Sequence, residues 1–435
     1  MNQLQLFLPC AAGVEGFLAD EVHGITGLTG NDLLVGRGGV LLRSSWRQAL
    51  QLNLHSRLAQ RVLVQLAHRM YRSENDLYAL ASDVAWEIWF TTRQSFKIEV
   101  TAQHSPLQSL NFAALKVKDA VADRFRAKTG VRPDVNTQWP DVRIHMHLTT
   151  DEATLYIDTS GEPLFKRGWR EDKGDAPLKE TLAAAMIAAT GWNGAEAASV
   201  DDIAPLYDPC CGSGTILVEA AQIACRIPAG MLRRFAFEKL LPFQAHVWNA
   251  IKKEAESAVQ TSAVPIFGSD VAFRMVDFAQ RNAERAGVAE AVQLRGGDAL
   301  QRMPPCEQPG VMLLNPPYGE RIAAAGTAGR DAGERAADRA RGLGVGREAA
   351  QTEDGGEFFS QLATHWKKNY SGWTAWMLTP DLKLPGKMRL KESRRVPMWN
   401  GPIECRMFRF DMIKGALRER PAKPPAAQNP GHGAP

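Results

Sequence analysis

The feature of this sequence that most constrains its fold is a regular alternation of short apolar runs and longer amphipathic segments from about residue 175 onward. The apolar runs are predicted strands at residues 203–209, 264–270, 291–298, 310–317 and 373–381. The amphipathic segments are predicted helices at residues 177–191, 214–227, 271–287 and 357–372. Strands that alternate with helices in this way are typical of a parallel sheet with helices on both faces, so the sequence predicts a doubly wound α/β domain.

A glycine-rich loop, DPCCGSG, separates the first of these strands from the next helix. Glycines here let a ligand approach the backbone, and the helix N-terminus offers free amide groups. A Walker-type phosphate loop needs a lysine after the last glycine, and none follows Gly214; a dinucleotide fingerprint needs a third glycine, which is missing. Asp208, Gly212 and Gly214 are therefore candidate residues for a ligand with a cationic amino group and not for a phosphate.

Two more acidic residues stand at the ends of the next strands. Asp270 closes the second strand, where a carboxylate can accept hydrogen bonds from ribose hydroxyls. Asp298 closes the third, where its side chain can reach an adenine amine. Each aspartate alone fits a helix cap or a turn equally well. Three acids at successive strand ends, however, predict a nucleoside ligand without phosphate, and S-adenosylmethionine fits this description.

The fourth strand ends in Asn315, Pro316, Pro317 and Tyr318, which is more than a strand terminus requires. An exocyclic base amine is a poor nucleophile, so its lone pair must be directed at the methyl group by acceptors for its two hydrogens. The Asn315 side-chain oxygen and the Pro316 carbonyl suit this task, and the prolines fix the backbone. Tyr318 can stack on a base turned out of its helix. We predict chemistry without a metal ion or a covalent enzyme intermediate; the alternative is a proline-rich turn.

The first 168 residues mix short strands and helices with short connections, which is typical of α+β domains. We place boundaries after residue 72 and near residue 168, followed by a domain at 169–415. Residues 323–356 lack aromatic residues and contain few large apolar ones, so we expect a flexible insertion there. The proline-, alanine- and glycine-rich tail at 416–435 is expected to be disordered.

Composition excludes several classes of protein. A chain of 435 residues suggests more than one domain, and no apolar run approaches a membrane span. Its six cysteines lack C-x-x-C spacing and nearby histidine pairs, which argues against a disulfide framework or a zinc site. The N-terminal residues lack the basic start of a signal peptide, so we expect a cytoplasmic protein.

Positive charge is concentrated locally, although the net charge of +4 is too small to indicate nucleic acid by itself. Residues 383–420 contain 11 Lys or Arg against 4 Asp or Glu. Lysine and arginine give salt-dependent, sequence-independent affinity for phosphates. The predicted helix near residue 116 also carries acidic residues, so a solvated face is an equally good interpretation there. The candidate RNA contacts are Lys116, Lys118, Arg394, Arg395 and Arg406.

The ordered motifs DPCCGSGT, GSD, GGD and NPPYGER resemble those of class I S-adenosylmethionine-dependent methyltransferases that modify exocyclic amines. The stretch PLKETLAAAM and the α+β portion ending in FKRGWR resemble the RNA-modifying branch with a THUMP domain, most closely the large-subunit (23S) rRNA guanine-N2 methyltransferases. The resemblance extends over about residues 1–412. It implies a ferredoxin-like domain at 1–72, a THUMP RNA-binding domain at 73–168, and a Rossmann-like methyltransferase domain at 169–415 with a seven-stranded mixed sheet.

The resemblance also implies roles for single residues. In that family, positions matching Asp208, Gly212, Gly214, Asp270 and Asp298 hold S-adenosylmethionine, and those matching 315–318 hold the target base. Thr181 is a weaker correspondence, in a helix beside the methionine end of the cofactor. The segment 323–356 is the main departure from the family pattern, and Leu314 stands where relatives carry a polar residue.

The implied activity is methyl transfer to guanine N2 in 23S rRNA. Guanine-N2 methylation of tRNA and adenine-N6 methylation of RNA or DNA stay open as alternatives, because the same geometry serves each amine. A non-enzymatic alternative is an RNA-binding assembly factor on an inactive scaffold; the intact glycine loop and Asn315 argue against it. The sequence determines neither the modified nucleotide nor the oligomeric state.

Overall fold

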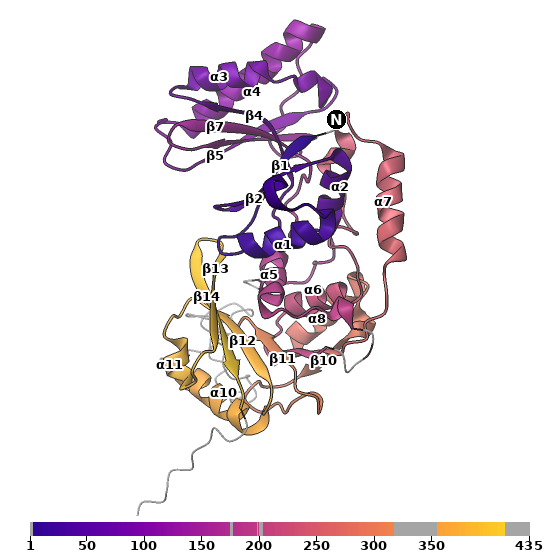
Figure 1. Cartoon of the computed structure of the whole chain (residues 1–435), viewed down its shortest axis with the longest axis vertical. Coiled ribbons are helices and arrows are strands. Elements are labelled where there is room, and N and C mark those ends of the chain that lie inside the picture. Colours follow the sequence, from indigo (N-terminus) through magenta and orange to yellow (C-terminus); the bar gives the residue numbers. More distant parts are fainter. Residues whose placement is uncertain (1–2, 175–176, 198, 200–202, 317–354, 414–435) are drawn as a thin grey trace, which may run out of the picture.

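The computed structural model describes residues 3–174, 177–197, 199, 203–316 and 355–413. Within these ranges the strands form two seven-stranded sheets, each in a separate lobe (Figure 1). We call them the N-terminal lobe and the C-terminal lobe. None of the described helices combines the length and the hydropathy that a membrane-spanning segment needs.

The N-terminal sheet has the strand order β2-β3-β1-β4-β7-β6-β5, and of its described pairs only β5–β6 is parallel. The strands are β1 (Leu4–Pro9), β2 (Leu33–Gly36), β3 (Gly39–Ser44), β4 (Leu63–Met70), β5 (Phe96–Ala102), β6 (Val142–Leu148) and β7 (Glu152–Asp158). The helices are α1 (Glu15–Thr26), α2 (Trp46–His55), α3 (Glu74–Asp83) and α4 (Leu110–Thr129). The expected α+β class is confirmed. Because β4 pairs with both β1 and β7, strands on either side of residue 72 share one sheet, and the boundary itself stays a prediction.

The C-terminal sheet has the order β10-β9-β8-β11-β12-β14-β13. Its strands are β8 (Leu206–Asp208), β9 (Ile266–Asp270), β10 (Val292–Gly296), β11 (Val311–Leu314), β12 (Thr374–Thr379), β13 (Arg394–Asn400) and β14 (Ile403–Asp411). The first five are parallel to one another, and β14 is antiparallel to both β12 and β13. The predicted doubly wound, mixed seven-stranded sheet is therefore confirmed among the described residues. The strand order reverses between β8 and β11, which is where such sheets bind ligands.

Each face of this sheet is buried, as continuous apolar strands require. On one face, Leu206 and Leu313 pack with α5 (Glu180–Thr190), α6 (Thr215–Ala224) and α8 (Phe273–Arg285). On the other, Tyr207 and Met312 pack with α10 (Gly355–Asn369) and α11 (Leu384–Met388). Neighbouring residues of one strand thus enter different cores, which fixes the register of each strand end.

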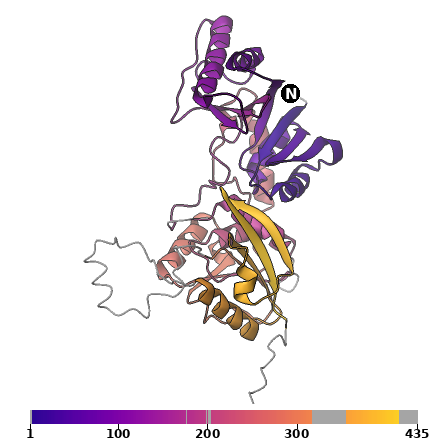
Figure 2. The same ribbon diagram turned by 90° about the vertical axis from the view of Figure 1, so that its left-hand side faces the viewer.

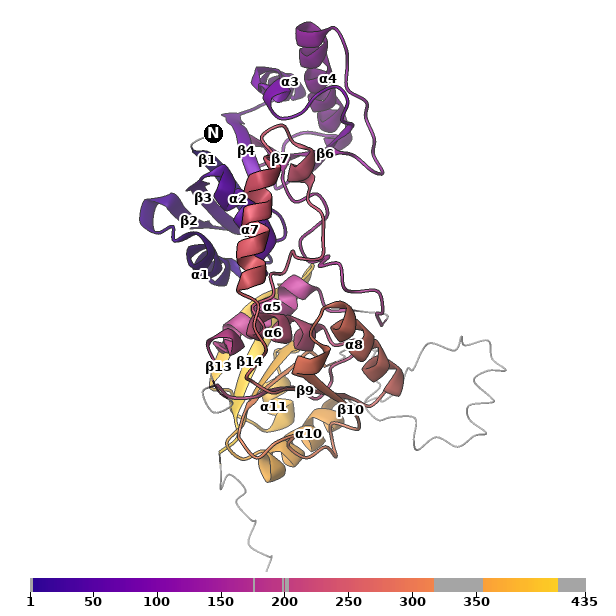
Figure 3. The same cartoon turned by 90° about the vertical axis from the view of Figure 1, so that its right-hand side faces the viewer.

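One segment of the C-terminal part leaves its own lobe, which the sequence did not indicate. Helix α7 (Ala245–Ser257) lies alongside the N-terminal lobe (Figure 3). The chain leading to α7 hydrogen-bonds to that lobe's backbone, from Gly230 N to Leu54 O at 2.8 Å and from Phe237 N to Thr159 O at 2.9 Å. The two lobes are therefore joined by main-chain bonds as well as by the linker.

A buried ion cluster at the lobe junction adds to these bonds. Glu219 of α6 is fully buried and pairs with Arg167 at 3.0 Å and with Arg57 of the N-terminal lobe at 3.1 Å. Arg167 also donates to the backbone oxygens of Leu164 and Arg57. The β13–β14 hairpin likewise reaches toward the N-terminal lobe (Figure 2). Because the ion cluster is buried, removing one partner would leave an uncompensated charge.

Candidate active site

The polar residues predicted at strand ends do lie along one edge of the C-terminal sheet. Asp208 ends β8, Asp270 ends β9, and Asn315 directly follows β11. Asp298 comes two residues after the end of β10. Since β10, β9, β8 and β11 are parallel neighbours, their carboxyl ends meet at this edge, across the point where the strand order reverses.

The glycine loop crosses from the end of β8 toward β9. Cys211 N donates to Ser269 O at 2.9 Å, and Gly212 N donates to Asp270 Oδ2 at 2.9 Å. Gly212 has φ +52°, and a Cβ added there would point into open space, so the loop leaves room for a ligand beside it. Gly214 has φ +83°, and a Cβ there would come within 2.9 Å of the Ala279 Cβ on α8. Gly214 therefore has a packing role, since it lets α6 and α8 approach each other.

Asp208 is the most deeply buried of the three aspartates. It is 2% exposed and accepts a hydrogen bond from Cys210 N at 3.0 Å. Burial, with a smaller contribution from the negative charge of Asp270, raises the pKa of Asp208 well above its usual value. A carboxylate in this setting gains from a nearby cation, because a positive charge would offset its desolvation.

Asp270 and Asp298 both also act as local turn residues. Asp270 Oδ1 accepts from Ala272 N at 2.9 Å, and Asp298 Oδ1 accepts from Leu300 N at 2.9 Å. These bonds fix the orientation of both carboxylates at the sheet edge. Both are half-buried, so the cap and ligand interpretations are compatible with one another.

Asn315 presents an unsatisfied acceptor. Its Oδ1 is buried and has no hydrogen-bond partner among the described residues. The next residue, Pro316, is buried. Pro317 and Tyr318 lie outside the described residues, as does the predicted insertion at 323–356. An unpaired buried acceptor costs about 1–3 kcal/mol, so its presence at a strand end marks a position where a donor from a ligand would be stabilised.

Arg170, a residue that the sequence analysis did not single out, connects the first turn of α5 to the residue that follows the glycine loop. Arg170 donates to Glu180 Oε1 at 2.7 Å and to Thr215 Oγ1 at 2.7 Å, and so links α5 to the first residue of α6. Thr181, adjacent to Glu180, is buried. Burial is the main reason that the pKa of Glu180 is raised, and Arg170 opposes this effect.

A second residue that the sequence analysis missed is Phe273, the first residue of α8. Its side chain is 81% exposed, and its ring lies over Gly296 at the end of β10, since a Cβ on Gly296 would come within 2.8 Å of the ring. The ring therefore lies at the carboxyl end of β10, where Gly296 is the register partner of Asp270 of β9. The sequence did contain a signal for this residue, because Phe273 stands at the start of a predicted helix but off the apolar face of that helix.

Neither cysteine of the loop is suited to act as a nucleophile. Cys210 and Cys211 have their thiol pKa values raised well above normal, mainly by burial and then by Asp208. A thiol that resists deprotonation is a weak nucleophile. No group of three or more His, Cys, Asp or Glu in the described residues is arranged to hold a metal ion.

The candidate RNA contacts fall in two separate places. Lys116 and Lys118 are on α4, where Lys118 pairs with Asp119 at 2.8 Å and Lys116 lies 5.5 Å from the centroid of Phe112. Arg394 and Arg395 are exposed on β13, and Arg406 on β14 pairs with Glu404 at 2.6 Å. Other α4 cations are also paired: Arg124 makes a two-pronged bond to Glu87. These ion pairs are compatible with the alternative interpretation of α4 as a solvated helix face.

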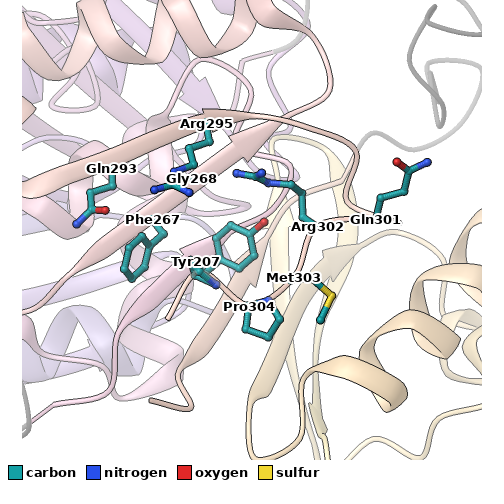
Figure 4. Close-up of a pocket in the computed structure, with 10 residues that line it drawn as sticks. Tyr207, Phe267, Gly268, Gln293, Arg295, Gln301, Arg302, Met303 and Pro304 are labelled. Carbon is teal, nitrogen blue, oxygen red and sulfur yellow. The ribbon is translucent and has the colours of Figure 1, made fainter. Parts of the chain in front are cut away.

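A cavity of about 290 Å³ opens beside β8, β9 and β10, and its lining includes Tyr207, Phe267 and the arginines 295 and 302 (Figure 4). Tyr207 hydrogen-bonds to Ser269 Oγ at 2.7 Å. None of the residues lining this cavity is a predicted site residue. It is therefore distinct from the strand-end site.

Three family models match this chain in succession. The RlmL ferredoxin-like domain matches residues 5–63, the THUMP domain residues 71–158, and the RMKL-like methyltransferase domain residues 167–331. The order is the one that the sequence resemblance implied.

Whole proteins give the same picture. A curated relative from Psychromonas ingrahamii, the ribosomal RNA large subunit methyltransferase K/L, is 33% identical over 97% of this chain and 52% of its own length. The chain thus spans about half the length of this relative. Among solved structures, a protein assigned by prediction as a methyltransferase and solved in complex with SAH is 25% identical, with a TM-score of 0.78 over 94% of this chain and 98% of that one. A Listeria monocytogenes protein, assigned by prediction as an N6-adenine-specific DNA methylase, is 26% identical, with a TM-score of 0.76 over 94% and 96%.

Proposed function

We propose that this chain is an enzyme that transfers a methyl group from S-adenosylmethionine to guanine N2 in 23S rRNA, in the cytoplasm. The matches to an RlmL ferredoxin-like domain, a THUMP domain and an RMKL-like methyltransferase domain support this proposal. The observation that carries the proposal is Asn315 Oδ1, a buried acceptor without a partner among the described residues, at the strand-order reversal. The curated relatives named as large-subunit rRNA methyltransferases support the choice of RNA.

The strand-end residues fit the proposed cofactor in chemical type. Asp208, buried and with a raised pKa, would gain from the amino group, and Gly212 leaves open space next to the loop. Asp270 would hold the ribose and Asp298 the adenine amine, with the exposed ring of Phe273 available to stack on the adenine. Thr181 would contact the methionine end. When bound, S-adenosylmethionine supplies an electrophilic methyl group on its sulfonium.

The role proposed for the loop after β11 is orientation of the base. Asn315 Oδ1 accepts one hydrogen of the exocyclic amine, and the Pro316 carbonyl accepts the other. The amine lone pair is then held toward the methyl group, and alignment carries most of the rate. Pro317 restricts the backbone and Tyr318 stacks on the base; both assignments rest on the sequence, because these residues lie outside the described ranges.

For RNA contact we propose the exposed Arg394 and Arg395 of β13, together with Arg406 of β14, which is the register partner of Pro397. Lys116 and Lys118 stand as candidates on the same footing, because Arg395 is likewise paired with an acid, Glu392 at 3.7 Å, and Arg394 likewise lies over an aromatic ring, that of Trp376.

Adenine-N6 methylation is a second candidate function, favoured by one observation. The 26% identical Listeria monocytogenes protein is assigned by prediction as an N6-adenine-specific DNA methylase, and the two acceptors at residues 315 and 316 would serve that amine equally well. Guanine-N2 methylation of tRNA differs only in the RNA.

The test is mass-spectrometric mapping of modified nucleosides in rRNA and tRNA from a strain lacking the gene, complemented by the wild-type chain or by Asn315→Ala. We expect one N2-methylguanine in 23S rRNA to disappear and to return only with the wild-type chain. Unchanged rRNA with a nucleoside lost from tRNA would redirect the assignment to tRNA. A lost N6-methyladenine would favour the second candidate.

A further inference from the structure

A pocket of about 590 Å³ lies at the junction of the two lobes, apart from the strand-end site. Three chain segments line it: residues 162–173, 177–180 and 233–234. Seven of its fourteen lining residues are Lys or Arg and three are Glu, so it is the more basic of the two cavities described here. We call it the junction pocket.

Part of this positive charge has no acidic partner. Arg167 and Arg170 are neutralised by buried Glu219 and Glu180. Lys173 and Arg234 are exposed, and neither forms an ion pair within the described part of the chain. Lys179 is also exposed; its Nζ lies 5.2 Å from the centroid of the Phe165 ring, without an ion pair among the described residues. These three side chains come from different segments but converge on one pocket, which favours an anion as ligand.

Two arginines of the pocket also hold unsatisfied donors. Arg170 Nη1 and Arg233 Nε are buried and have no hydrogen-bond partner among the described residues. Arg233 donates to the backbone oxygens of Pro163 at 2.8 Å and Lys166 at 3.1 Å, not to a carboxylate. Burial and then the neighbouring Arg167 lower the pKa of Arg233 to about 10, so it stays charged at neutral pH. Buried donors without acceptors are costly, and anionic oxygens nearby would stabilise them.

The position of the pocket connects it to the site of methyl transfer. Arg170, in its wall, donates to Thr215 Oγ1 at the start of α6, directly after the glycine loop. Lys179, also in its wall, directly precedes α5, which carries Thr181. A long anion bound here would therefore run between the N-terminal lobe and the proposed catalytic edge. The half-buried ring of Phe165 adds an aromatic surface of the kind on which unpaired bases stack.

We propose that the junction pocket binds the phosphate backbone of the substrate RNA next to the nucleotide that is modified, with Lys173, Lys179 and Arg234 as its phosphate contacts. This inference rests on the proposed function in so far as it takes RNA as the substrate. It adds an RNA site at residues that neither the sequence analysis nor the comparisons assigned.

The test compares the double variant Lys173→Ala/Arg234→Ala with the matched control Lys253→Ala/Lys368→Ala, which removes two exposed cations from α7 and α10. Binding of a fluorescent, unmodified fragment of large-subunit rRNA is measured by anisotropy over a series of KCl concentrations. We expect the junction variant to lower the slope of log Kd against log salt by about 0.7–0.9 per lost contact and to weaken binding about 15- to 30-fold near 0.15 M salt. The control should match the wild type, and calorimetry should give the same S-adenosylmethionine affinity for all three proteins.

Equal slopes for the junction variant and the wild type would overturn the inference, even if the wild type methylates rRNA. A second result would separate the two proposals. If the junction variant lowers the salt slope of RNA binding but the wild type methylates none of the RNAs offered, the inference is preserved and the proposed function is removed. A titration with inorganic phosphate at constant ionic strength distinguishes the source of the anion. Saturable phosphate binding lost in the variant, with an unchanged RNA slope, would assign the pocket to a free anion and overturn the RNA assignment.

Discussion

Glu219 at the lobe junction and Asp208 at the sheet edge are both buried carboxylates of one strand–loop–helix unit, yet their surroundings are opposite. Glu219 is held by two guanidinium groups, from Arg57 and Arg167. Asp208 accepts from a backbone N–H and faces another acid, Asp270. The first charge is compensated within the protein. The second is not, and a buried polar group that its own chain leaves uncompensated points to a ligand.

The same contrast extends to their neighbours. At the junction, Arg167 directs its remaining donors to backbone oxygens, whereas at the edge Asn315 Oδ1 has no partner among the described residues. Substitutions should therefore act on different quantities in the two regions. Substitutions in the buried ion cluster of Arg57, Arg167 and Glu219 should lower the free energy of unfolding, whereas substitutions at the edge should mainly change ligand binding or turnover.

The largest expected effect is that of Glu219→Ala. It would leave Arg57 and Arg167 buried without a counter-charge, and we expect the free energy of unfolding to fall by about 3–5 kcal/mol. Urea unfolding followed by tryptophan fluorescence measures this. The matched control is Glu254→Ala, which removes an exposed partner of Arg47 and should cost no more than about 1 kcal/mol. Equal losses for both variants would show that burial does not distinguish the two ion pairs.

Asn315→Ala should give the next largest effect, at the edge. Removing the acceptor that is proposed to orient the amine should lower kcat by about 10²–10³, as loss of one transition-state hydrogen-bond partner does. The free energy of unfolding should not fall, because the wild-type Oδ1 has no described partner to lose. Single-turnover methylation of rRNA and calorimetry of S-adenosylmethionine binding measure the two quantities. A loss of cofactor affinity beyond a few fold would contradict the role assigned to Asn315.

The edge could be predicted from the sequence because its information is local. Each of these candidate residues stands at or within two residues of the end of an apolar run, and parallel strands bring such ends together whatever the rest of the chain does. The order Asp208, Asp270, Asp298 and Asn315 along the chain therefore mapped onto one sheet edge. The choice of ligand was narrowed further by only two things. The missing lysine and third glycine argued against a phosphate or a dinucleotide, and the family resemblance implied S-adenosylmethionine.

The junction could not be predicted, because its contacts join residues far apart in the sequence. Arg57, Arg167 and Glu219 come from separate segments, and nothing local distinguishes them from exposed charges. The return of α7 to the N-terminal lobe has no sequence signal for the same reason. The pairing of Arg124 on α4 with Glu87, a residue from another element, has no local sequence signal for the same reason.

Asp270→Ala should have an effect of intermediate size, on cofactor binding. It would show that the edge contains some residues that bind the cofactor and others that orient the base. Hydrogen bonds to a charged group contribute about 1.5–3 kcal/mol, so the Kd for S-adenosylmethionine should rise about 10- to 100-fold. At saturating cofactor, kcat should change much less than in Asn315→Ala. The control is Asp277→Ala on α8, an exposed acid paired with Arg281, for which the Kd should be unchanged. A fall in kcat without a rise in Kd would place Asp270 in the orienting part instead.

The smallest expected effect is a gain in stability at the edge, from Asp208→Asn. Burial raises the pKa of Asp208 in the folded protein above the unfolded value, so its contribution is most favourable below about pH 4 and is lost as the pH rises through the folded pKa. Asparagine does not ionise, so the variant should be no less stable than the wild type at low pH and more stable at neutral pH. A gain of about 1 kcal/mol would appear as a rise of roughly 2–4 °C in Tm. Thermal unfolding without cofactor from pH 4 to pH 8 measures this. Added S-adenosylmethionine should make the wild type the more stable of the two proteins, because it would bind more weakly to the asparagine variant.

The corresponding acid-to-amide substitution at the junction, Glu219→Gln, should instead lower Tm at neutral pH, since it removes a compensated charge. A variant Asp208→Asn that is less stable than the wild type at neutral pH would mean that Asp208, like Glu219, is already compensated by the chain.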